Sequence, residues 1–367
     1  MKGQKIFLNH ILMINRIYIK NAKQIGQSLK RGRNMKLIGH AVVLVLILVI
    51  ILPLFMVKGC DLDNELKNDQ PLEQKVTISV LNHGSNEAMN LGLEEYIVGV
   101  IAAEMPVTFD IEALKAQAIA ARTYTVKRLE QFGGSPNEDH PQYDVCTDPA
   151  HCQAWINKED RIKAWKNDKR YKKLDYEESW KRIQKAVMST QGLIAVYNGE
   201  PIDPLFHSTS GGKTENSEDY FDAKVPYLRS VISQYEKKSP HLASETEMTT
   251  EEFVNKLKKE LPDIKIDAKN IENEIKILGT TEGGKIAKIQ IGNKTLTGRE
   301  AREILGLNSS NFEVKKSGGK LHFTVIGYGH GVGMSQYGAD GMAQEGSDYE
   351  EIIKHYYQGV EIVNIYE

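Results

Sequence analysis

The chain has 367 residues, enough for one large domain or two small ones. Its 47 basic and 49 acidic side chains leave a formal net charge of −2. Such a balance creates no general field that would attract nucleic acid, so we expect no nucleic-acid partner. Three cysteines are too few for a disulfide scaffold.

The N-terminal residues predict a membrane anchor. Residues 1–36 carry nine Lys or Arg and no Asp or Glu, and residues 37–57 follow as a nearly unbroken apolar run. A helix of 21 residues spans about 30 Å of hydrocarbon. Because basic residues precede the run and acidic residues follow it, we expect a single-pass protein with a cytoplasmic tail and the remaining chain outside the membrane.

Two other interpretations of this region are a cleaved signal peptide and a lipoprotein signal that ends at Cys60. The apolar run is long for a signal peptide, and Lys58 is an unusual neighbour for a lipidated cysteine. Met35 followed by Lys36 would also serve as a start, which leaves the status of residues 1–34 open. Residues 58–75 are polar and predict a linker.

The next segment predicts a strand and a helix. Val76, Ile78 and Val80 alternate with polar residues, as in a half-buried strand. A helix is predicted for 93–104, where apolar residues recur at helical spacings, and it ends there because Pro106 disfavours helical geometry at Met105.

A second helix is predicted to begin after Asp110, a favourable N-terminal capping residue. Its apolar face runs to Thr125, and five alanines between 113 and 121 would allow another backbone to approach closely.

Glu104 is therefore a carboxylate at a helix end among apolar neighbours. Burial disfavours the ionised form of a carboxylate and raises its pKa, so that the group can hold a proton near neutrality. A general acid needs this property. The alternative is a solvated glutamate without a catalytic role.

A loop at residues 136–156 contains four residues that bind soft metals: His140, Cys146, His151 and Cys152. Imidazole and thiolate groups, four in number, are what tetrahedral zinc prefers. A disulfide between Cys146 and Cys152, with two incidental histidines, is the alternative. The spacing alone leaves both interpretations open.

The middle of the chain predicts an exposed helical region and a hairpin. Residues 157–185 are dense in charge, which is typical of exposed helix. Residues 193–197 predict a strand, and Asn198-Gly199 predicts a hairpin turn after it. The serines and glycines of 208–214 would let a ligand approach the backbone. They also raise the hypothesis of a serine hydrolase with His207 or His330 as base, but no G-x-S-x-G elbow is present.

Residues from about 240 to 318 predict an inserted lobe. It contains a helix at 245–261, a hairpin from strands 274–278 and 286–291, and a helix at 298–305. The chain returns with a strand at 321–326 and a glycine-rich segment at 327–339. No βαβ frame surrounds that segment, so it is not a dinucleotide-binding fingerprint. The fold class predicted for residues 76–367 is α+β.

Several of these motifs resemble those of the stage II sporulation protein D family, which also contains the amidase enhancers. The first is formed by residues 94–100, 103–106 and 113–124. Residues 208–214, 216–221 and 226–230 resemble the glycine-rich loop of the family and the segments after it, and residues 327–339 resemble its second signature. The resemblance covers most of residues 76–366, so that 76–367 is expected to be a catalytic domain of this kind.

The resemblance implies roles for individual residues. Glu104 would be the catalytic acid, and the second signature would meet it across a groove. The family has a Tyr-x-Lys pair where this chain has Tyr227 and Arg229, a change that keeps the charge but alters the donor geometry. Substrate-binding roles are expected for Arg122, Ser208, Ser210, Gly211, Gly212, Lys213, Tyr227, Arg229, His330, Gln336 and Tyr337.

The resemblance further implies a membrane-anchored lytic transglycosylase that acts on peptidoglycan during forespore engulfment. It would cut peptide-stripped glycan strands between N-acetylmuramic acid and N-acetylglucosamine, leaving 1,6-anhydro ends, in cooperation with a sporulation cell-wall amidase and membrane engulfment proteins. Some clostridial-type members carry a zinc loop at the place of 136–156, while others lack it, and this favours a structural zinc with a closed ligand shell.

Two other functional classes are kept as alternatives. One is a non-catalytic scaffold that binds glycan and stimulates an amidase. The other is a zinc peptidase, which would need an open metal site with a nearby base, and no H-E-x-x-H helix supplies these.

Overall fold

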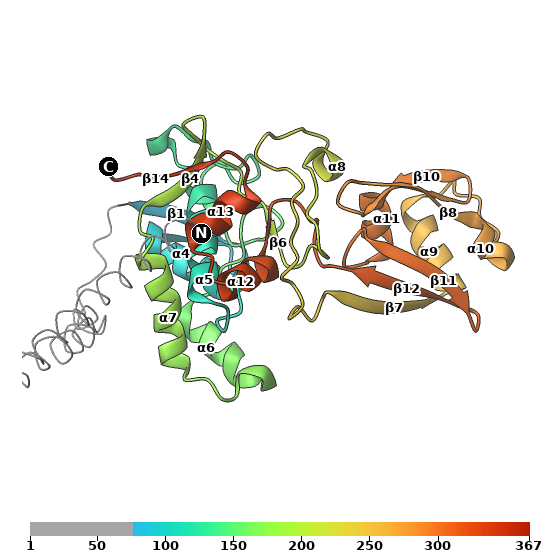
Figure 1. Ribbon diagram of the computed structural model, residues 1–367, viewed down its shortest axis with the longest axis horizontal. Coiled ribbons are helices and arrows are strands. Elements are labelled where there is room, and N and C mark those ends of the chain that lie inside the picture. Colours follow the sequence, from blue (N-terminus) through green and yellow to red (C-terminus); the bar gives the residue numbers. More distant parts are fainter. Residues whose placement is uncertain (1–75) are drawn as a thin grey trace, which may run out of the picture. The chain divides into compact units, whose positions relative to one another are not determined.

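The computed structural model describes residues 76–367, which form a mixed α+β fold with several small sheets (Figure 1). The predicted α+β class is confirmed for this part of the chain. No helix within 76–367 is both long enough and apolar enough to cross a membrane. The predicted tail 1–36, membrane span 37–57 and linker 58–75 lie outside the described residues and stay predictions.

Helix α5 (Ile111–Val126) lies at the centre of the first hydrophobic core. Its neighbours are α4 (Leu93–Glu104), α7 (Tyr176–Met188), β4 (Leu193–Tyr197), α12 (Gln336–Gln344) and α13 (Tyr349–Tyr356). Its five alanines between 113 and 121 are fully buried, so these neighbours approach its backbone closely, as predicted.

The predicted boundaries of α4 and α5 are confirmed. Met105 has extended backbone geometry directly before Pro106, which ends α4. The Asp110 side chain accepts a hydrogen bond from the Glu112 N–H at 3.0 Å, which caps α5.

Short sheets accompany this core. The predicted strand at 76–80 is β1 (Thr77–Asn82), which pairs antiparallel with β2 (Glu87–Gly92) and parallel with β3 (Val145–Cys146). A second sheet has the order β14 (Glu361–Asn364), β4, β5 (Glu200–Pro201). The β4–β5 turn has positive φ at Asn198 (52°) and Gly199 (83°), as the predicted hairpin requires. Strands β6 (Phe206–His207) and β13 (Met334–Ser335) pair in parallel, and a short helix, α8 (Glu218–Phe221), follows β6.

A second hydrophobic core extends from Met248 to Val325. One sheet has the order β11 (Phe312–Ser317), β12 (Lys320–Ile326), β7 (Ala243–Thr249), and another has the order β10 (Lys294–Thr297), β9 (Ile286–Ile291), β8 (Ile275–Thr280). Helices α9 (Thr250–Glu260), η5 (Ala268–Asn270), α10 (Ile271–Glu274) and α11 (Gly298–Leu305) complete this part. The predicted hairpin and the predicted helix at 298–305 are confirmed. Strand β12, expected to belong to the main domain, packs its buried side chains into this second core because it pairs with both β11 and β7.

Two helix predictions were wrong in extent. The helix predicted for 245–261 begins at Thr250, because Thr249 and Glu252 form a capping box and residues 243–249 pair with β12. The charged region 157–185 is not a continuous exposed helix. It contains α6 (Lys158–Asn167), η4 (Lys169–Tyr171) and the first part of α7, and both Trp165 and Trp180 are buried.

A buried ion pair joins α4 to α5. The Arg122 guanidinium, fully inaccessible to solvent, donates three hydrogen bonds to the Glu94 carboxylate, with N···O distances of 3.0, 3.1 and 2.6 Å. Its other donors bind the carbonyls of Leu193 (3.0 Å) and Val187 (3.2 Å). The pair therefore fixes both helices to the connection between α7 and β4.

Arg122→Met is expected to lower the free energy of unfolding by roughly 3–5 kcal/mol, since it leaves the Glu94 carboxylate buried without a cation. Lys354→Met is the control, because Lys354 and Glu350 form an exposed pair one helical turn apart. Its free energy of unfolding should stay close to that of the parent protein. Denaturant unfolding measures the free energy of unfolding of both variants. Equally small losses in the two would contradict a stabilising role for the buried pair of Arg122 and Glu94.

Candidate functional site

Glu104 lies at the C-terminal end of α4, where two other parts of the chain reach it. The Ala154 N–H donates to Glu104 Oε1 at 3.1 Å, and the Gln336 side-chain amide donates to the Glu104 carbonyl at 3.3 Å. Burial raises the pKa of Glu104, opposed by hydrogen bonds from Ala154 and from Gln336. The carboxyl group thus holds its proton to a higher pH than a solvated glutamate, as a general acid must.

The N-terminal end of α12 joins the two predicted motifs. The Tyr337 ring packs edge-on against Phe109, with 4.8 Å between ring centroids, and the Tyr337 N–H donates to the Ser208 carbonyl at 3.1 Å. Of the predicted site residues, Gln336, Tyr337 and Ser208 are therefore brought to the neighbourhood of Glu104.

The predicted ligand-binding donors of the glycine-rich loop are already occupied within the protein. The backbone N–H groups of Ser210, Gly211 and Gly212 donate to the buried carboxylate of Glu236. Glu236 is not among the residues predicted for the site. The Ser233-x-x-Glu236 spacing is that of a capping box, but no apolar run follows it to mark a helix.

Lys213, Tyr227 and Arg229 have partners away from Glu104. Lys213 pairs with Glu282 at 2.9 Å, and the Tyr227 hydroxyl accepts from the Asp203 N–H at 2.9 Å. Both terminal nitrogens of Arg229 bind the Glu218 carboxylate, and this contact lowers the pKa of Glu218 to about 2. None of the three contacts Glu104 in the part of the chain that the structure describes.

Arg122, expected to bind substrate, lies in the core with Glu94, where no glycan reaches its guanidinium. Its contacts with Glu94 instead hold α4 and α5 together. A charged residue inside a helix motif looks the same in sequence whether it is buried or exposed, so the motif did not reveal this location.

His330 and His207 form an aromatic cluster. Their ring centroids are 5.6 Å apart, and the His330 ring also packs against Tyr220 and Phe221. Burial, with nearby Arg302, lowers the pKa of His330 to about 4. His330 Nδ1 accepts from the Val332 N–H at 3.1 Å, and His207 Nδ1 lies 3.2 Å from the Val332 carbonyl, so these contacts give no support to a serine–histidine pair.

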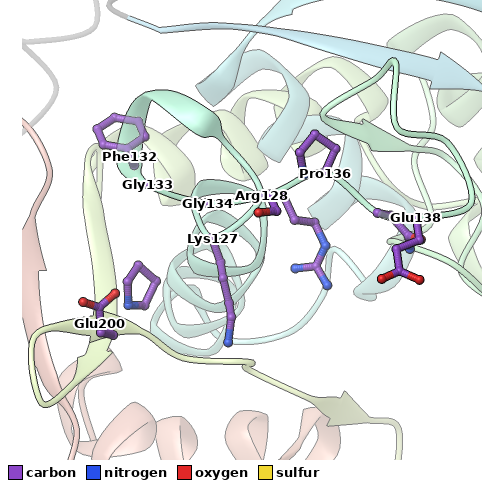
Figure 2. A pocket seen from close by; sticks show the side chains of 11 residues that line it. Lys127, Arg128, Phe132, Gly133, Gly134, Pro136, Glu138 and Glu200 are labelled. Carbon is purple, nitrogen blue, oxygen red and sulfur yellow. The ribbon is translucent and has the colours of Figure 1, made fainter.

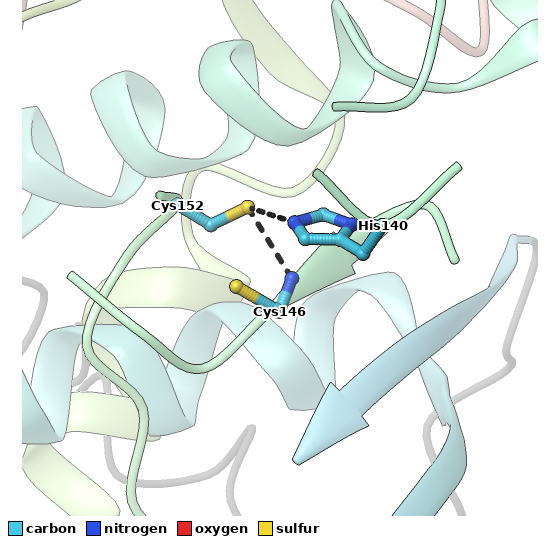
Figure 3. A group of neighbouring side chains, drawn as sticks. All are labelled: His140, Cys146 and Cys152. Carbon is cyan, nitrogen blue, oxygen red and sulfur yellow. Dashed lines mark hydrogen bonds between the residues drawn. The ribbon is translucent and has the colours of Figure 1, made fainter. Parts of the chain in front are cut away.

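Three of the four predicted metal ligands converge. The ligand atoms of His140, Cys146 and Cys152 all lie within 4.8 Å of one another, and both cysteines are free thiols (Figure 3). His140 Nε2 is 3.2 Å from Cys152 Sγ. One imidazole and two thiols suit zinc, and burial raises the pKa of the Cys146 thiol to about 11.

His151 lies apart from this group. Its ring packs edge-on against His83, with centroids 6.4 Å apart, and its carbonyl accepts from the Tyr124 hydroxyl at 2.9 Å. The backbone forms a turn here, in which the His151 and Cys152 N–H groups both donate to the Asp148 carbonyl, at 3.2 and 2.7 Å. Two residues beyond Cys152, Ala154 contacts Glu104, so the loop connects directly to the candidate acid.

A cavity of about 530 Å³ opens between the end of α5, residues 132–138 and the β4–β5 hairpin (Figure 2). Lys127 and Arg128 project toward it, but Lys127 pairs with Asp203 and Arg128 stacks on the Tyr124 ring. None of the predicted site residues lines this cavity, so it is separate from the surroundings of Glu104.

Comparison with known proteins gives consistent matches. Residues 82–197 match the family model described as "Stage II sporulation protein". Stage II sporulation protein D of Bacillus subtilis (strain 168) is 43% identical over 78% of this chain and 79% of its own length. The protein of the same name from Bacillus amyloliquefaciens is 40% identical over 81% of this chain and 82% of its own length. The amidase enhancer of Bacillus subtilis (strain 168) is 27% identical, over 72% of this chain and 40% of its own length.

The low pKa of His330 predicts a stability change with pH. The unfolded chain binds a proton at His330 near pH 6.5, whereas the folded chain does so only near pH 4. Between these values the unfolded state holds more protons, so the free energy of unfolding falls as the pH falls. In His330→Gln this fall should be smaller than in the parent protein, as measured by denaturant unfolding at pH 7, 5.5 and 4.5. If the free energy of unfolding changes with pH in the same way in both proteins, His330 does not have the lowered pKa.

Proposed function

Because the chain belongs to the stage II sporulation protein D family, we propose that it is a sporulation enzyme of the cell wall, a lytic transglycosylase. The observation that carries the proposal is the environment of Glu104. A partly buried carboxyl group with a raised pKa lies at a helix end, and the side chain of Gln336, in the second signature, donates to the backbone carbonyl of the same residue.

In the proposed reaction, Glu104 acts first as acid and then as base. The protonated carboxyl group gives its proton to the glycosidic oxygen between N-acetylmuramic acid and N-acetylglucosamine, and the bond from that oxygen to C1 breaks. The resulting carboxylate takes the proton of the C6 hydroxyl of the muramic acid, whose oxygen bonds to C1. The product is a 1,6-anhydro end, and Glu104 regains its proton.

One carboxyl group suffices for this reaction, whereas hydrolysis ordinarily uses two. The pKa of Glu104 is shifted by burial and by hydrogen bonds from Ala154 and Gln336. In the lytic mechanism that we propose, Glu104 alone serves as acid and base.

The substrate we propose is glycan already stripped of its peptides, supplied by a sporulation cell-wall amidase during engulfment. The similarity to an amidase enhancer supports a partnership of this kind, and it equally motivates the second candidate, a scaffold that binds glycan and stimulates the amidase. We also propose that residues 37–57 anchor the chain in the membrane, with the catalytic part outside the cytoplasmic membrane. This part of the proposal rests on the charge pattern of the sequence.

Glu104→Gln should abolish cleavage while leaving the fold and glycan binding intact, since the amide keeps the shape but cannot deliver a proton at neutral pH. Mass spectrometry of peptide-free glycan, digested by the full-length chain, measures the products. Glu112→Gln is the control, because Glu112 lies on α5 and pairs with Lys115. It should keep the parent activity.

Each product pattern has a distinct meaning. Anhydro ends that disappear only in Glu104→Gln support the lytic mechanism, and reducing ends would indicate a hydrolase instead. Folded parent protein that binds glycan without cleaving it would favour the scaffold. Parent-like rates for Glu104→Gln would exclude Glu104 as the acid.

We further propose that His140, Cys146 and Cys152 hold one structural zinc, with His151 as the fourth ligand. The three converging ligand atoms support this, and the fourth requires the His151 side chain to turn toward them. Bound zinc would order the loop that carries Ala154 to Glu104, because metal-binding free energy becomes local folding free energy. It supplies no step of the reaction.

Elemental analysis of protein purified without a metal-affinity tag should find about one zinc per chain, as one tetrahedral site requires. Cys146→Ser should lose the metal. His151→Ala should weaken binding if His151 completes the shell, and unchanged affinity would assign the fourth position to another ligand. Zinc-free parent protein with Cys146 and Cys152 oxidised to each other would show a disulfide in place of the metal site.

A further inference from the structure

Glu236 is a buried carboxylate, 2% exposed, with an unusually complete set of hydrogen-bond donors. Three backbone N–H groups and three hydroxyls point at its two oxygens. The donors to Oε1 are Ser210 N (3.0 Å), Ser210 Oγ (2.8 Å), Ser233 Oγ (2.8 Å) and Ser335 Oγ, and those to Oε2 are Gly211 N (2.8 Å) and Gly212 N (3.3 Å).

No Lys or Arg of the described residues lies within ion-pair distance of this carboxylate. Its direct contacts are instead neutral dipoles, in the way that a nest of backbone N–H groups binds an anion, while Lys285 interacts with it electrostatically from a greater distance. Burying a carboxylate is costly unless hydrogen bonds satisfy it, so these donors and Glu236 depend on one another. Substitution of Glu236 would release all the segments that it holds.

Two of those segments lead to the candidate acid. Ser335 donates to Glu236 and its Oγ also accepts from the Gly338 N–H at 3.1 Å, which caps α12. The loop around Ser210 supplies the Ser208 carbonyl, which accepts from the Tyr337 N–H at 3.1 Å. Gln336, the residue between these two anchors, places its amide against Glu104.

The packing around α12 leaves no room for adjustment. A Cβ atom added at Gly338 would lie 2.0 Å from the Tyr356 hydroxyl and 2.3 Å from Ser233 Oγ. Those two groups are themselves hydrogen-bonded at 2.8 Å, and Ser233 also binds Glu236. The first turn of α12 is therefore held on one side by the glycine-rich loop and on the other by α13.

We propose that Glu236 is a positioning residue, which orients Gln336 beside Glu104 by fixing the 208–212 loop and the N-terminal end of α12 to one buried carboxylate. The proposal rests on the proposed function for the catalytic role of Glu104. Glu236 acts only through these contacts and does not touch substrate.

The test uses Glu236→Gln in the full-length chain. The amide keeps the size of the side chain but presents N–H donors where the carboxylate accepted, so that it faces other N–H groups. If Gln336 then moves away, the hydrogen bond that lowers the pKa of Glu104 is lost. The pKa of Glu104 should therefore rise. Carboxyl carbon-13 NMR measures it, with the Glu104 resonance identified by its absence in Glu104→Gln.

A double-mutant cycle separates positioning from a general structural role. Gln336→Ala should raise the pKa of Glu104 by the same amount, and the double variant should add nothing further.

In the cleavage assay, Glu236→Gln should lower kcat roughly tenfold or more with little change in KM, and should move the alkaline limb of the pH profile upward. Glu252→Gln is the control, because Glu252 is an exposed carboxylate that accepts backbone and hydroxyl hydrogen bonds from Thr249 at the start of α9, away from Glu104. It should change none of these values.

An unchanged pKa of Glu104 in folded Glu236→Gln would overturn the proposal, and so would additive shifts in the double variant. If Glu236→Gln does not fold, Ser335→Ala takes its place. This variant removes only the hydrogen bond from Ser335 to Glu236, and the pKa of Glu104 is measured in it in the same way. The NMR measurement does not need cleavage. Absence of activity in the parent protein would therefore refute the proposed function while leaving the positioning role to be decided by the pKa.

Discussion

The ion pair between Arg122 and Glu94 is the contact on which the rest of the site depends. Both charges are removed from water, and a buried pair of this kind is stable only because the guanidinium also satisfies the carbonyls at the end of α7 and the start of β4. Glu94 lies in the first turn of α4 and Glu104 in its last. The direction in which Glu104 points is thus determined by where its own helix is anchored, about 15 Å away along the axis.

Three buried carboxylates hold the loops around Glu104, each in a different electrostatic way. Glu94 is neutralised by a guanidinium and Glu236 by backbone and hydroxyl dipoles. Glu215 pairs with Lys285 Nζ at 3.3 Å, and burial raises the pKa of Glu215 while it lowers that of Lys285. Lys285 also reaches the carbonyls of Ser210 and Lys213, so the same loop is held by an anion and by a cation. A loop with several glycines gains its fixed shape from these charges, since it has little side-chain packing of its own.

The features that could be predicted from sequence are those with local causes. The helix at 93–104 follows from apolar spacing and from Pro106 after its end, and the helix at 298–305 begins at a capping box of Thr297 and Glu300. The hairpin at 198–199 follows from its turn residues. The features that could not be predicted depend on contacts between distant residues: Glu236 binds Ser335, which is 99 positions away, and no local pattern marks either residue as a partner. Arg122 and His151 were assigned by type and position, but the direction of a side chain depends on the neighbours that folding brings to it.

The contact of Lys285 has a consequence for the modularity of the protein. The lobe has its own hydrophobic core, which is the usual mark of a unit that evolution can insert, exchange or delete. Yet the turn of its β8–β9 hairpin supplies the counter-ion for Glu215, and Gly283 and Gly331 leave the space that this side-chain pair occupies. A shortened descendant without the lobe would retain a buried, unneutralised carboxylate beneath its glycine-rich loop. Loss of the lobe would therefore require a compensating change at position 215, and the two should be gained and lost together across related proteins.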